Sequence, residues 1–475
     1  MKKIIASALC LTMAAAVFAG CDGAKETTAT TGSDAPATTA DAGTPDTTAA
    51  ASDAVADGDK TVINLWSFTD EVPNMIEKYK ELNPDFASKY DVKVTIIATT
   101  NGEYQPALDA ALMAGGEDAP DMYCAEAAFI LKYTQGEASS FACPYEDLGI
   151  DVNAAISEAD IAGYSVAIGT NPDGKVVGLG YQATGGCFIY RRSIATEVFG
   201  SDDPAAVAEA IGGGSQSWDK FWEAAQTLAD KGYVICSGDG DIWHAVENSS
   251  SCGWVVDGAL TISPEREAFL DISKDLKDKG FTNDTQDWTD AWYADMAGEG
   301  AKGCFGFFGP AWLINYTMGG NCGSTSGDWA VTNSPVGFFW GGTWVLANKD
   351  VANADADKKQ AIADIIYWIT LDCTENGLQY LWANGLMNDA GTKDSVASTT
   401  VMNMSDGSVD FLGGQNMFEY FVPANAYANG TCLTPYDETI NSLFRAQVNA
   451  YRNGEKDRDA ALADFQSAVN EQLGF

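Results

Sequence analysis

Tryptophan and carboxylate side chains are the residues of this chain whose chemistry best suits a bound ligand. The 475 residues include 13 Trp, 67 Asp and Glu, and only 27 Lys and Arg, so the formal net charge is -40. Flat aromatic rings pack against apolar C–H faces, whereas carboxylates and amides accept hydrogen bonds from hydroxyl groups. Since a sugar ring presents both kinds of surface, this composition favours a carbohydrate ligand.

Several tryptophans occupy positions where a strand is expected to end or where glycine opens the backbone; they are Trp66, Trp312, Trp340 and Trp344. Trp243 follows the Gly-Asp-Gly-Asp segment at 238–241, which we expect to form a loop. Each of these rings is a candidate for ligand contact, and core or hinge packing is the alternative for each. Helical spacing predicts core positions for Trp222, Trp368 and Trp382.

Other chemistries find little support in the sequence. His244 is the single histidine, which excludes a His-pair metal site and disfavours a Ser-His-Asp triad. Residues 178–183 match G-x-G-x-x-A, but a strand is expected at 187–190, where a dinucleotide site needs a helix. Segment 238–241 lacks the remaining ligands of a calcium loop, so we expect a plain turn. The negative charge argues against nucleic acid and anionic lipid. We expect no metal, cofactor or catalytic residue.

The N-terminal segment has the layout of a secretory signal peptide over residues 1–20. Lys2 and Lys3 precede an apolar run at 4–18, and Ala-Gly then leads to Cys21. This end resembles the lipobox of bacterial lipoproteins, with Phe18 in place of the usual Leu, which implies that Cys21 carries lipid such as palmitate. The alternative is an ordinary signal peptide with a fortuitous cysteine. Residues 21–60 are mostly Ala, Thr, Asp, Gly, Ser and Pro, so we expect a disordered spacer.

Strands alternate with helices after residue 60, which predicts an α/β fold. The length favours two or three domains. Apolar patterning and capping residues predict strands at 62–66 and 92–97, helices at 72–82 and 104–113, a helix capped by Ser263 before Pro264, and amphipathic helices at 440–451 and 462–473.

Seven short segments, in the expected order, resemble the sugar-binding type of extracellular solute-binding protein (family 1, maltose-binding-protein-like), the substrate receptor of ABC importers. They lie at 63–66, 79–85 (YKELNPD), 104–121, 171–178 (NPDGKVVG), 217–221, 300–312 and 341–346. Each is weak alone, but together they are specific, and the resemblance covers residues 61–475. Arg191 departs from the pattern, because an Asn commonly follows the tyrosine of the crossover strand.

The resemblance implies a two-lobed periplasmic-binding-protein-like fold of type II, whose lobes close on ligand by a hinge. Both lobes would be discontinuous in sequence. Lobe 1 would comprise residues 61–183 and 342–421, and lobe 2 residues 184–341 and 422–475. Crossing hinge strands are expected near 180–186, 340–344 and 418–424.

The resemblance also implies a ligand site and partners. An acidic ligand contact is usual in the family at the position of Glu126. The complete expected set is Trp66, Ser67, Glu126, Tyr181, Trp243, Trp312, Trp340 and Trp344. The implied protein is a lipid-anchored, monomeric, non-enzymatic receptor on the extracytoplasmic face, which delivers a sugar or oligosaccharide to ABC permease subunits. The alternatives are a receptor for another solute, such as a polyamine cation, and a secreted glycoside hydrolase, whose barrel would repeat eight strand-helix units.

The cysteines leave their pairing open. Cys10 and Cys21 belong to the signal and anchor, and an odd number remains of the 11 cysteines, so at least one thiol is free unless two chains pair. Cys124 with Cys143, or Cys304 with Cys322, lie close enough in sequence to form disulfides. Some of the others are expected to be small buried apolar residues.

Overall fold

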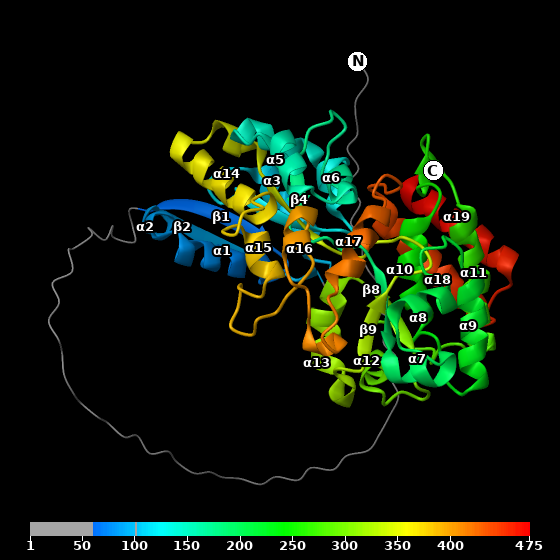
Figure 1. Cartoon of the computed structure of the whole chain (residues 1–475). Coiled ribbons are helices and arrows are strands. Elements are labelled where there is room, and N and C mark those ends of the chain that lie inside the picture. Colours follow the sequence, from blue (N-terminus) through cyan, green and yellow to red (C-terminus); the bar gives the residue numbers. More distant parts are fainter. Residues whose placement is uncertain (1–59, 100–101) are drawn as a thin grey trace, which may run out of the picture. The chain divides into compact units, whose positions relative to one another are not determined.

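The computed structural model describes residues 60–99 and 102–475 (Figure 1). The expected signal peptide, the spacer up to residue 59 and Cys21 lie outside the described residues. None of the helices within the described ranges is long and apolar enough to cross a membrane.

The first sheet has five strands in the order β2-β1-β3-β10-β4. They are β1 (Thr61–Ser67), β2 (Tyr90–Ile96), β3 (Met122–Glu126), β4 (Gly178–Gly180) and β10 (Thr343–Ala347). β1 pairs in parallel with β2 and β3, whereas β10 is antiparallel to β3 and β4. Because β10 comes from a much later part of the chain, this sheet draws on two separate segments, as expected.

Helices of the first sheet are α1 (Glu71–Leu82), α2 (Pro84–Lys89), α3 (Tyr104–Ala114), α4 (Ile130–Thr134), α5 (Val152–Ala159), α6 (Gly163–Ile168), α14 (Ala356–Thr370), α15 (Leu378–Ala383) and α16 (Thr399–Met404). The buried face of α1 recurs at helical spacing, and Asn83 ends the helix before Pro84 starts α2. We call this sheet and its helices lobe 1. Short 3₁₀ helices η2 (Ser139–Phe141), η3 (Tyr145–Leu148) and η6 (Lys349–Asn353) connect its elements.

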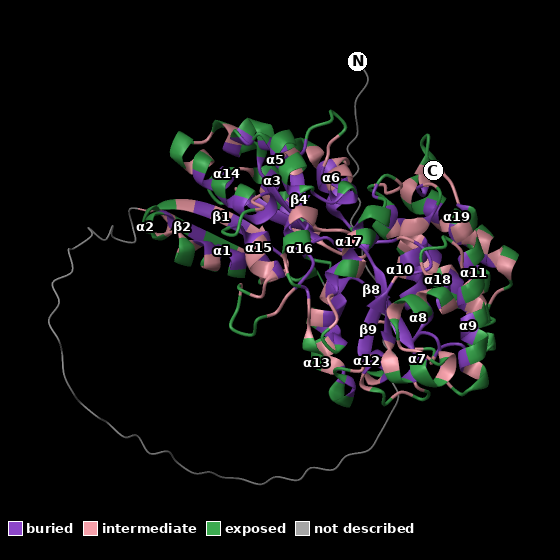
Figure 2. Ribbon diagram, in the orientation of Figure 1, coloured by how far each residue is buried: buried purple, intermediate pink, exposed green. Residues whose placement is uncertain are grey.

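The second sheet has three antiparallel strands in the order β8-β5-β9, which are β5 (Cys187–Arg191), β8 (Gly306–Gly309) and β9 (Trp329–Thr332). Its helices are α7 (Arg192–Phe199), α8 (Pro204–Ile211), α9 (Asp219–Asp230), α10 (Asp239–Ser249), α11 (Pro264–Asp278), α12 (Asp290–Ala297), α13 (Gly319–Asn321), α18 (Asp437–Arg452) and α19 (Arg458–Leu473). We call this sheet and these helices lobe 2. Figure 2 shows β8 and β9 in the colour of buried residues, beside helices such as α8 and α9 that carry exposed residues.

Smaller elements of lobe 2 are the hairpin of β6 (Val255–Val256) and β7 (Ala259–Leu260), the π-helix η4 (Leu313–Met318) and the 3₁₀ helices η5 (Gly323–Thr325) and η7 (Asp410–Leu412).

A capping residue and apolar stripes determine where the long helices of lobe 2 begin and how they pack. Ser263 Oγ accepts the N–H of Arg266 at the start of α11, as the sequence predicts. The apolar stripes of α18 and α19 meet at Trp254, whose ring contacts Phe444 and Phe465.

Two extended segments cross between the sheets. Residues 181–186 link β4 to β5, and residues 333–342 link β9 to β10. The two run side by side, because the N–H of Gly186 donates to Phe338 O (2.9 Å) and the N–H of Trp340 donates to Thr184 O (3.0 Å). We call these two segments the paired crossing; they correspond to the first two expected hinge strands.

Residues 418–427 form a helix, so the strand expected at 418–424 is wrong. This helix, α17 (Phe418–Tyr427), buries Phe418, Phe421, Ala424 and Asn425, a spacing of three to four residues that indicates a helix. It also supports the paired crossing, since the N–H of Gly185 donates to Asn425 Oδ1 (2.9 Å).

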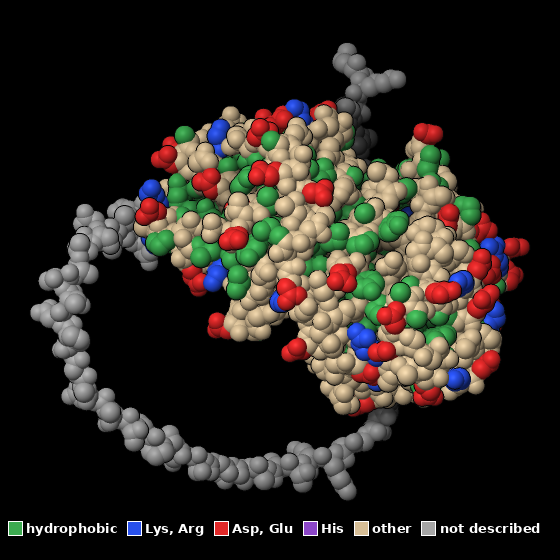
Figure 3. All heavy atoms as spheres, in the orientation of Figure 1, with side chains coloured by type: hydrophobic (Ala, Val, Ile, Leu, Met, Phe, Trp, Pro, Cys, Tyr) green, Lys and Arg blue, Asp and Glu red, His purple; other side chains and the backbone are tan. Residues whose placement is uncertain are grey.

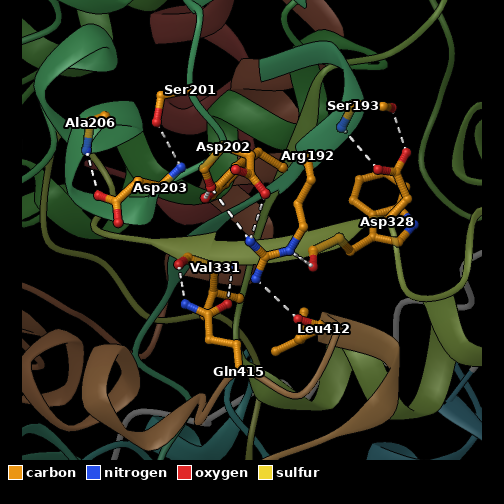
Figure 4. A network of polar contacts seen from close by, with 12 residues as sticks. Arg192, Ser193, Ser201, Asp202, Asp203, Ala206, Asp328, Val331, Leu412 and Gln415 are labelled. Atoms are coloured by element: carbon orange, nitrogen blue, oxygen red, sulfur yellow. Dashed lines mark hydrogen bonds and ion pairs between the residues drawn. The ribbon is translucent and has the colours of Figure 1, made fainter. Parts of the chain in front are cut away.

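The segment before α17 already packs on lobe 2 (Figure 4). Arg192 Nη2 donates to Leu412 O (3.1 Å), and Gln415 exchanges two hydrogen bonds with the backbone of Val331 in β9 (2.8 and 2.9 Å). We therefore propose that the last part of lobe 2 begins near residue 409, earlier than the expected boundary at 422. The other predicted lobe limits stay predictions.

The nine described cysteines are all free thiols, so the suggested disulfides Cys124–Cys143 and Cys304–Cys322 are wrong. Burial raises the pKa of the Cys124 thiol to about 12 and that of Cys143 to about 11. Both thiols are therefore protonated at neutral pH and act as small apolar residues of the core, as expected for some of the nine.

Candidate functional site

A cavity of 790 Å³ has walls from both lobes. Lobe 1 supplies residues 68–71 after β1, Glu126 at the end of β3, and the segment from Trp382 to Asp394. Lobe 2 supplies the segment after β8 and Trp288. The volume lies within the range of 300–1,000 Å³ that is typical of small-molecule sites.

The lobe 2 wall is aromatic. Trp288 and Trp312 have nearly parallel rings, with centroids 6.1 Å apart and an interplanar angle of 7°. Trp312 is fixed by Trp340: its Nε1–H donates to Trp340 O (2.9 Å), and the rings meet edge to face at 4.7 Å. Parallel rings on the wall of a cavity form a platform on which a flat apolar surface can stack.

Two properties of Trp288, its backbone conformation and its exposure, indicate a functional position. Its backbone has φ +65°, in the left-handed region that bulky residues rarely adopt, and the residue is 49% exposed. Such strain is typical of binding and catalytic sites, where the surrounding structure holds the residue in place. Sequence reasoning missed this ring, because no local pattern indicates the backbone conformation of 282–289.

The π-helix η4 also contributes to the aromatic wall. It follows β8 through Gly309 and Pro310, and Trp312 stands at its N-terminal end. Asn315 and Tyr316 of η4 line the cavity, and Tyr316 is 79% exposed. A π-helix is uncommon and is frequently found at functional sites.

The lobe 1 wall is acidic. Glu71 Oε2 accepts a hydrogen bond from the Tyr181 hydroxyl, Glu126 Oε2 accepts the N–H of Ala128 (2.7 Å), and Asp394 Oδ1 accepts the N–H of Ser395 (2.7 Å). Burial raises the pKa of each of these three carboxyls to about 7. Each can therefore donate or accept a proton in a hydrogen bond near neutral pH. Among the described residues that line this cavity there is no Lys or Arg.

Replacing Asp394 by Asn is expected to remove a pH-dependent destabilisation. Burial raises the folded-state pKa from 3.8 to about 7, so the folded protein holds this proton more tightly than the unfolded chain does. The Asp394 contribution to stability is therefore present at low pH and is lost as pH rises from about 4 to about 7. Relative to wild type, Asp394→Asn should gain on the order of 1 to 3 kcal/mol across this range, measured by denaturant melts.

Asp406→Asn is the control for this pH series. Its side chain is 70% exposed, and hydrogen bonds from Ser408 lower the pKa of its carboxyl, so a small trend of opposite sign is expected. A difference between Asp394→Asn and wild type that stays constant with pH would contradict the raised pKa.

Of the residues predicted from sequence, Glu126 and Trp312 line the cavity. Tyr181 lies behind its wall: it is 1% exposed, its hydroxyl donates to Glu71, and its ring stacks on Trp382. Trp382, predicted as a core residue, is half-buried: it packs against the core and also lines the cavity.

Three other predicted contacts, Trp66, Ser67 and Trp344, are not among the residues that line the cavity. Ser67 is fully buried and Trp344 is 1% exposed. Trp344 Nε1–H donates to Ser165 O (3.1 Å), which fixes its ring inside lobe 1.

The loop expected around Trp243 is wrong, because 238–241 begins the helix α10. Asp241 Oδ2 accepts the N–H groups of Ser237 and Gly238 (3.0 and 3.1 Å), which caps the helix. Trp243 is 5% exposed and packs against Phe269 and Phe444 at 4.9 and 5.4 Å between ring centroids. It lies in the core of lobe 2, away from the cavity wall.

A second cavity of 270 Å³ lies beside the first. Trp340 lines it and stacks on His244, with ring centroids 3.7 Å apart, while His244 Nε2 lies 3.0 Å from Asp287 Oδ2. The sequence predicted Trp340 as a ligand contact. In the structure Trp340 lines the second cavity and packs against Trp312, which lines the first.

These features define a binding protein with a ligand cavity between two α/β lobes. A family model described as bacterial extracellular solute-binding protein matches residues 74–399, and the chain belongs to this family. No curated protein matches the chain.

Solved structures share the fold. An extracellular solute-binding protein of family 1 is 18% identical, with 86% of this chain and 99% of the other covered and a TM-score of 0.66. The galacto-N-biose/lacto-N-biose I-binding protein of the Bifidobacterium longum ABC transporter is 17% identical, with 88% and 98% covered and a TM-score of 0.63. The acarbose-binding GacH receptor of Streptomyces glaucescens is 16% identical, with 87% and 99% covered and a TM-score of 0.59. The predicted two-lobed type II fold is confirmed.

Proposed function

We propose that the protein is an extracytoplasmic, non-enzymatic receptor that captures a sugar or oligosaccharide in the cavity between its lobes and delivers it to an ABC transporter permease. The observation that carries the proposal is the pairing of two walls. Lobe 2 offers the rings of Trp288 and Trp312, and lobe 1 offers the carboxyls of Glu71, Glu126 and Asp394. Rings suit sugar C–H faces, and carboxyls suit hydroxyls. The named ligands of similar structures are also saccharides.

Ligand-driven closure follows from this division of the walls. A ligand that contacts both lobes binds the closed arrangement more tightly than an open one, so it shifts the population toward closure. The paired crossing of 181–186 with 333–342, supported by α17, is the connection about which such a motion would occur.

A receptor for a cationic solute such as a polyamine is the second candidate. Asp70, Glu71, Glu126 and Asp394 line the cavity, and no Lys or Arg among the described residues does so. The paired tryptophans favour a sugar over a flexible amine, because stacking needs a flat apolar face. A glycoside hydrolase is less favoured, since the two-lobed fold is that of binding proteins.

A thermal-shift screen tests these candidates. A ligand at one hundred times its Kd stabilises the folded state by about 2.7 kcal/mol, which raises the melting temperature. We expect neutral oligosaccharides to raise it and spermidine and other polyamines to leave it unchanged. A shift with polyamines alone would replace the sugar proposal, and release of reducing ends from a bound oligosaccharide would show a hydrolase.

We also propose that Cys21 anchors the protein as a lipidated N-terminus and that it works as a monomer. The Cys21→Ser chain should move from the membrane to the soluble fraction and remain folded. Cys10→Ser is the matched control, because Cys10 lies in the apolar run of the signal peptide and should leave anchoring unchanged. Cell fractionation with a high-salt wash measures the result, and membrane retention of Cys21→Ser would refute the anchor.

The surface charge is consistent with a lipid anchor at the membrane. Figure 3 shows acidic side chains spread over the visible face, with fewer basic ones between them. A surface of this sign repels phosphate and anionic headgroups. Association with the membrane therefore needs the covalent lipid rather than electrostatic attraction.

A further inference from the structure

We infer that Asn315 of lobe 2 is a positioning residue, which fastens residues 385–393 of lobe 1 along the ligand cavity and so slows the escape of a bound ligand. We call residues 385–393 the strap. The inference rests on the proposed receptor function and specifies how the ligand is retained. It follows from the course of the strap along the cavity, its compact shape, and the hydrogen bond that joins it to the other lobe.

The strap belongs to a long connection between α15 and α16. All of residues 384–397 are described, and none of them belongs to a helix or strand. Connections of this length are uncommon and are often functional. Met387, Asn388 and Thr392 line the cavity, while residues 388–391 are exposed. The strap therefore lies between the cavity and the solvent.

The strap is a compact loop whose internal contacts do not fix its position. Gly385 has φ +70°, and a Cβ built on it would lie 2.5 Å from Gly391 O, so the two ends approach closely. The N–H of Gly391 donates to Asn388 O (3.1 Å), and the N–H of Thr392 donates to Asn388 Oδ1 (3.3 Å). Because these bonds lie within the loop, its place along the cavity depends on contacts with other elements.

Asn315 supplies the contact from lobe 2. It lies in the π-helix η4 and lines the cavity, and its Nδ2 donates to Lys393 O (2.6 Å). Burial raises the pKa of the adjacent Asp394 carboxyl, and a hydrogen bond from Asn315 counteracts part of this rise. Lys393 Nζ donates to Ser408 O (3.2 Å). Since Asn315 and Lys393 belong to different lobes, their bond forms only when the lobes are close, and it favours the closed arrangement.

Two substitutions separate the hydrogen bond of Asn315 from its packing. Asn315→Ala removes both, whereas Asn315→Asp keeps the shape of the side chain and, when ionised, has no N–H to donate. Asn321→Ala is the matched control. Asn321 is half-buried like Asn315, and its Nδ2 donates to Thr317 O (2.7 Å), but this bond lies within lobe 2 and Asn321 lines neither cavity.

Limited proteolysis of the full chain tests the fastening. Lys393 is the only trypsin site in the sequence between α15 and α16, and its side chain is 22% exposed. With a saturating amount of the neutral oligosaccharide that gives the largest thermal shift, wild type and Asn321→Ala should be protected at Lys393. Asn315→Ala and Asn315→Asp should lose most of this protection, measured as the fragment that begins at Asp394. A residue that only contacts the ligand leaves the protection intact at saturation, so equal protection in all four proteins would overturn the strap.

Stopped-flow tryptophan fluorescence with the same oligosaccharide measures the consequence for binding. Asn315→Ala and Asn315→Asp should release it about two- to tenfold faster than wild type, with little change in the association rate. Their melting temperatures without saccharide should stay close to that of wild type. Dissociation at the wild-type rate in both variants would overturn the retention role while the receptor function stands.

Failure of the proposed function gives a different result. If no saccharide shifts the melting temperature of wild type, the receptor proposal fails, and trypsin cleavage of the ligand-free proteins decides the fastening alone. Faster cleavage at Lys393 in both Asn315 variants than in Asn321→Ala would support it, and equal rates would overturn it.

Discussion

Trp243→Ala is expected to lower the free energy of unfolding by about 3 to 5 kcal/mol and to leave the ligand affinity of the folded protein nearly unchanged. The ring is 5% exposed and packs between Phe269 and Phe444, with the Arg445 guanidinium 5.7 Å from it. Truncation leaves a cavity among rigid neighbours from three helices, α10, α11 and α18, which cannot close around alanine without moving the helices.

Denaturant melts and calorimetric titration of the same preparations measure the two effects. Trp243→Phe is the companion variant: it keeps an aromatic ring in the core and should recover more than half of the lost stability. An affinity loss of more than about tenfold with little change in stability would instead place Trp243 at the ligand, where the sequence analysis had it.

The fold could be predicted where local signals decide it. Asn83 and Pro84 end one helix and start the next, and Ser263 with Pro264 starts α11. These signals act within a few residues, so they are readable without knowledge of the tertiary structure. The resemblance to solute-binding proteins then supplied the expectation that lobe 1 draws on two separate segments of the chain. The pairing of β10 with β3 and β4, which joins those segments, is contained in no local pattern.

Secondary-structure predictions were wrong where the local sequence suits two conformations and tertiary contacts decide between them. Residues 238–241 have the composition of a turn, yet Asp241 accepts two backbone N–H groups and caps a helix. The apolar run at 418–424 suits a strand, but its buried residues recur at helical spacing in α17. Asp and Gly favour both turns and helix starts, so composition alone does not separate these outcomes.

The ligand site was only partly predictable, because its members are far apart in sequence. Glu71 follows β1, Glu126 ends β3 and Asp394 lies between α15 and α16, so only the tertiary structure brings them to one cavity. A chain with 67 acidic residues gives no reason to select these three. Trp312 could be found because it follows a strand that ends in Gly-Pro. Trp288 could not, because its exposure and left-handed backbone are properties of the folded loop.

Trp312→Ala should weaken ligand binding about five- to hundredfold, which corresponds to about 1 to 3 kcal/mol. The ring lines the cavity and is held by its hydrogen bond to Trp340 O, so the platform is in place before the ligand binds. Binding to such a preformed surface has little ordering cost, and the whole stacking contribution therefore appears in the affinity. Trp288→Ala should show a loss of the same order, because its ring lies parallel to that of Trp312.

Measuring both ligand affinity and unfolding stability shows whether Trp288 and Trp312 act in binding or in folding. Trp288 is 49% exposed, so its truncation removes less buried surface than that of Trp243, which is 5% exposed. Trp288→Ala should therefore lose less stability than Trp243→Ala while its affinity falls. Trp312 is part-buried, so Trp312→Ala should also lose some stability, less than Trp243→Ala does. Tyr367→Ala, on an exposed position of α14 away from both cavities, should change neither quantity appreciably. Wild-type affinity in both Trp288→Ala and Trp312→Ala, measured by calorimetric titration, would remove the aromatic wall from the ligand site and leave the acidic wall as the feature to explain.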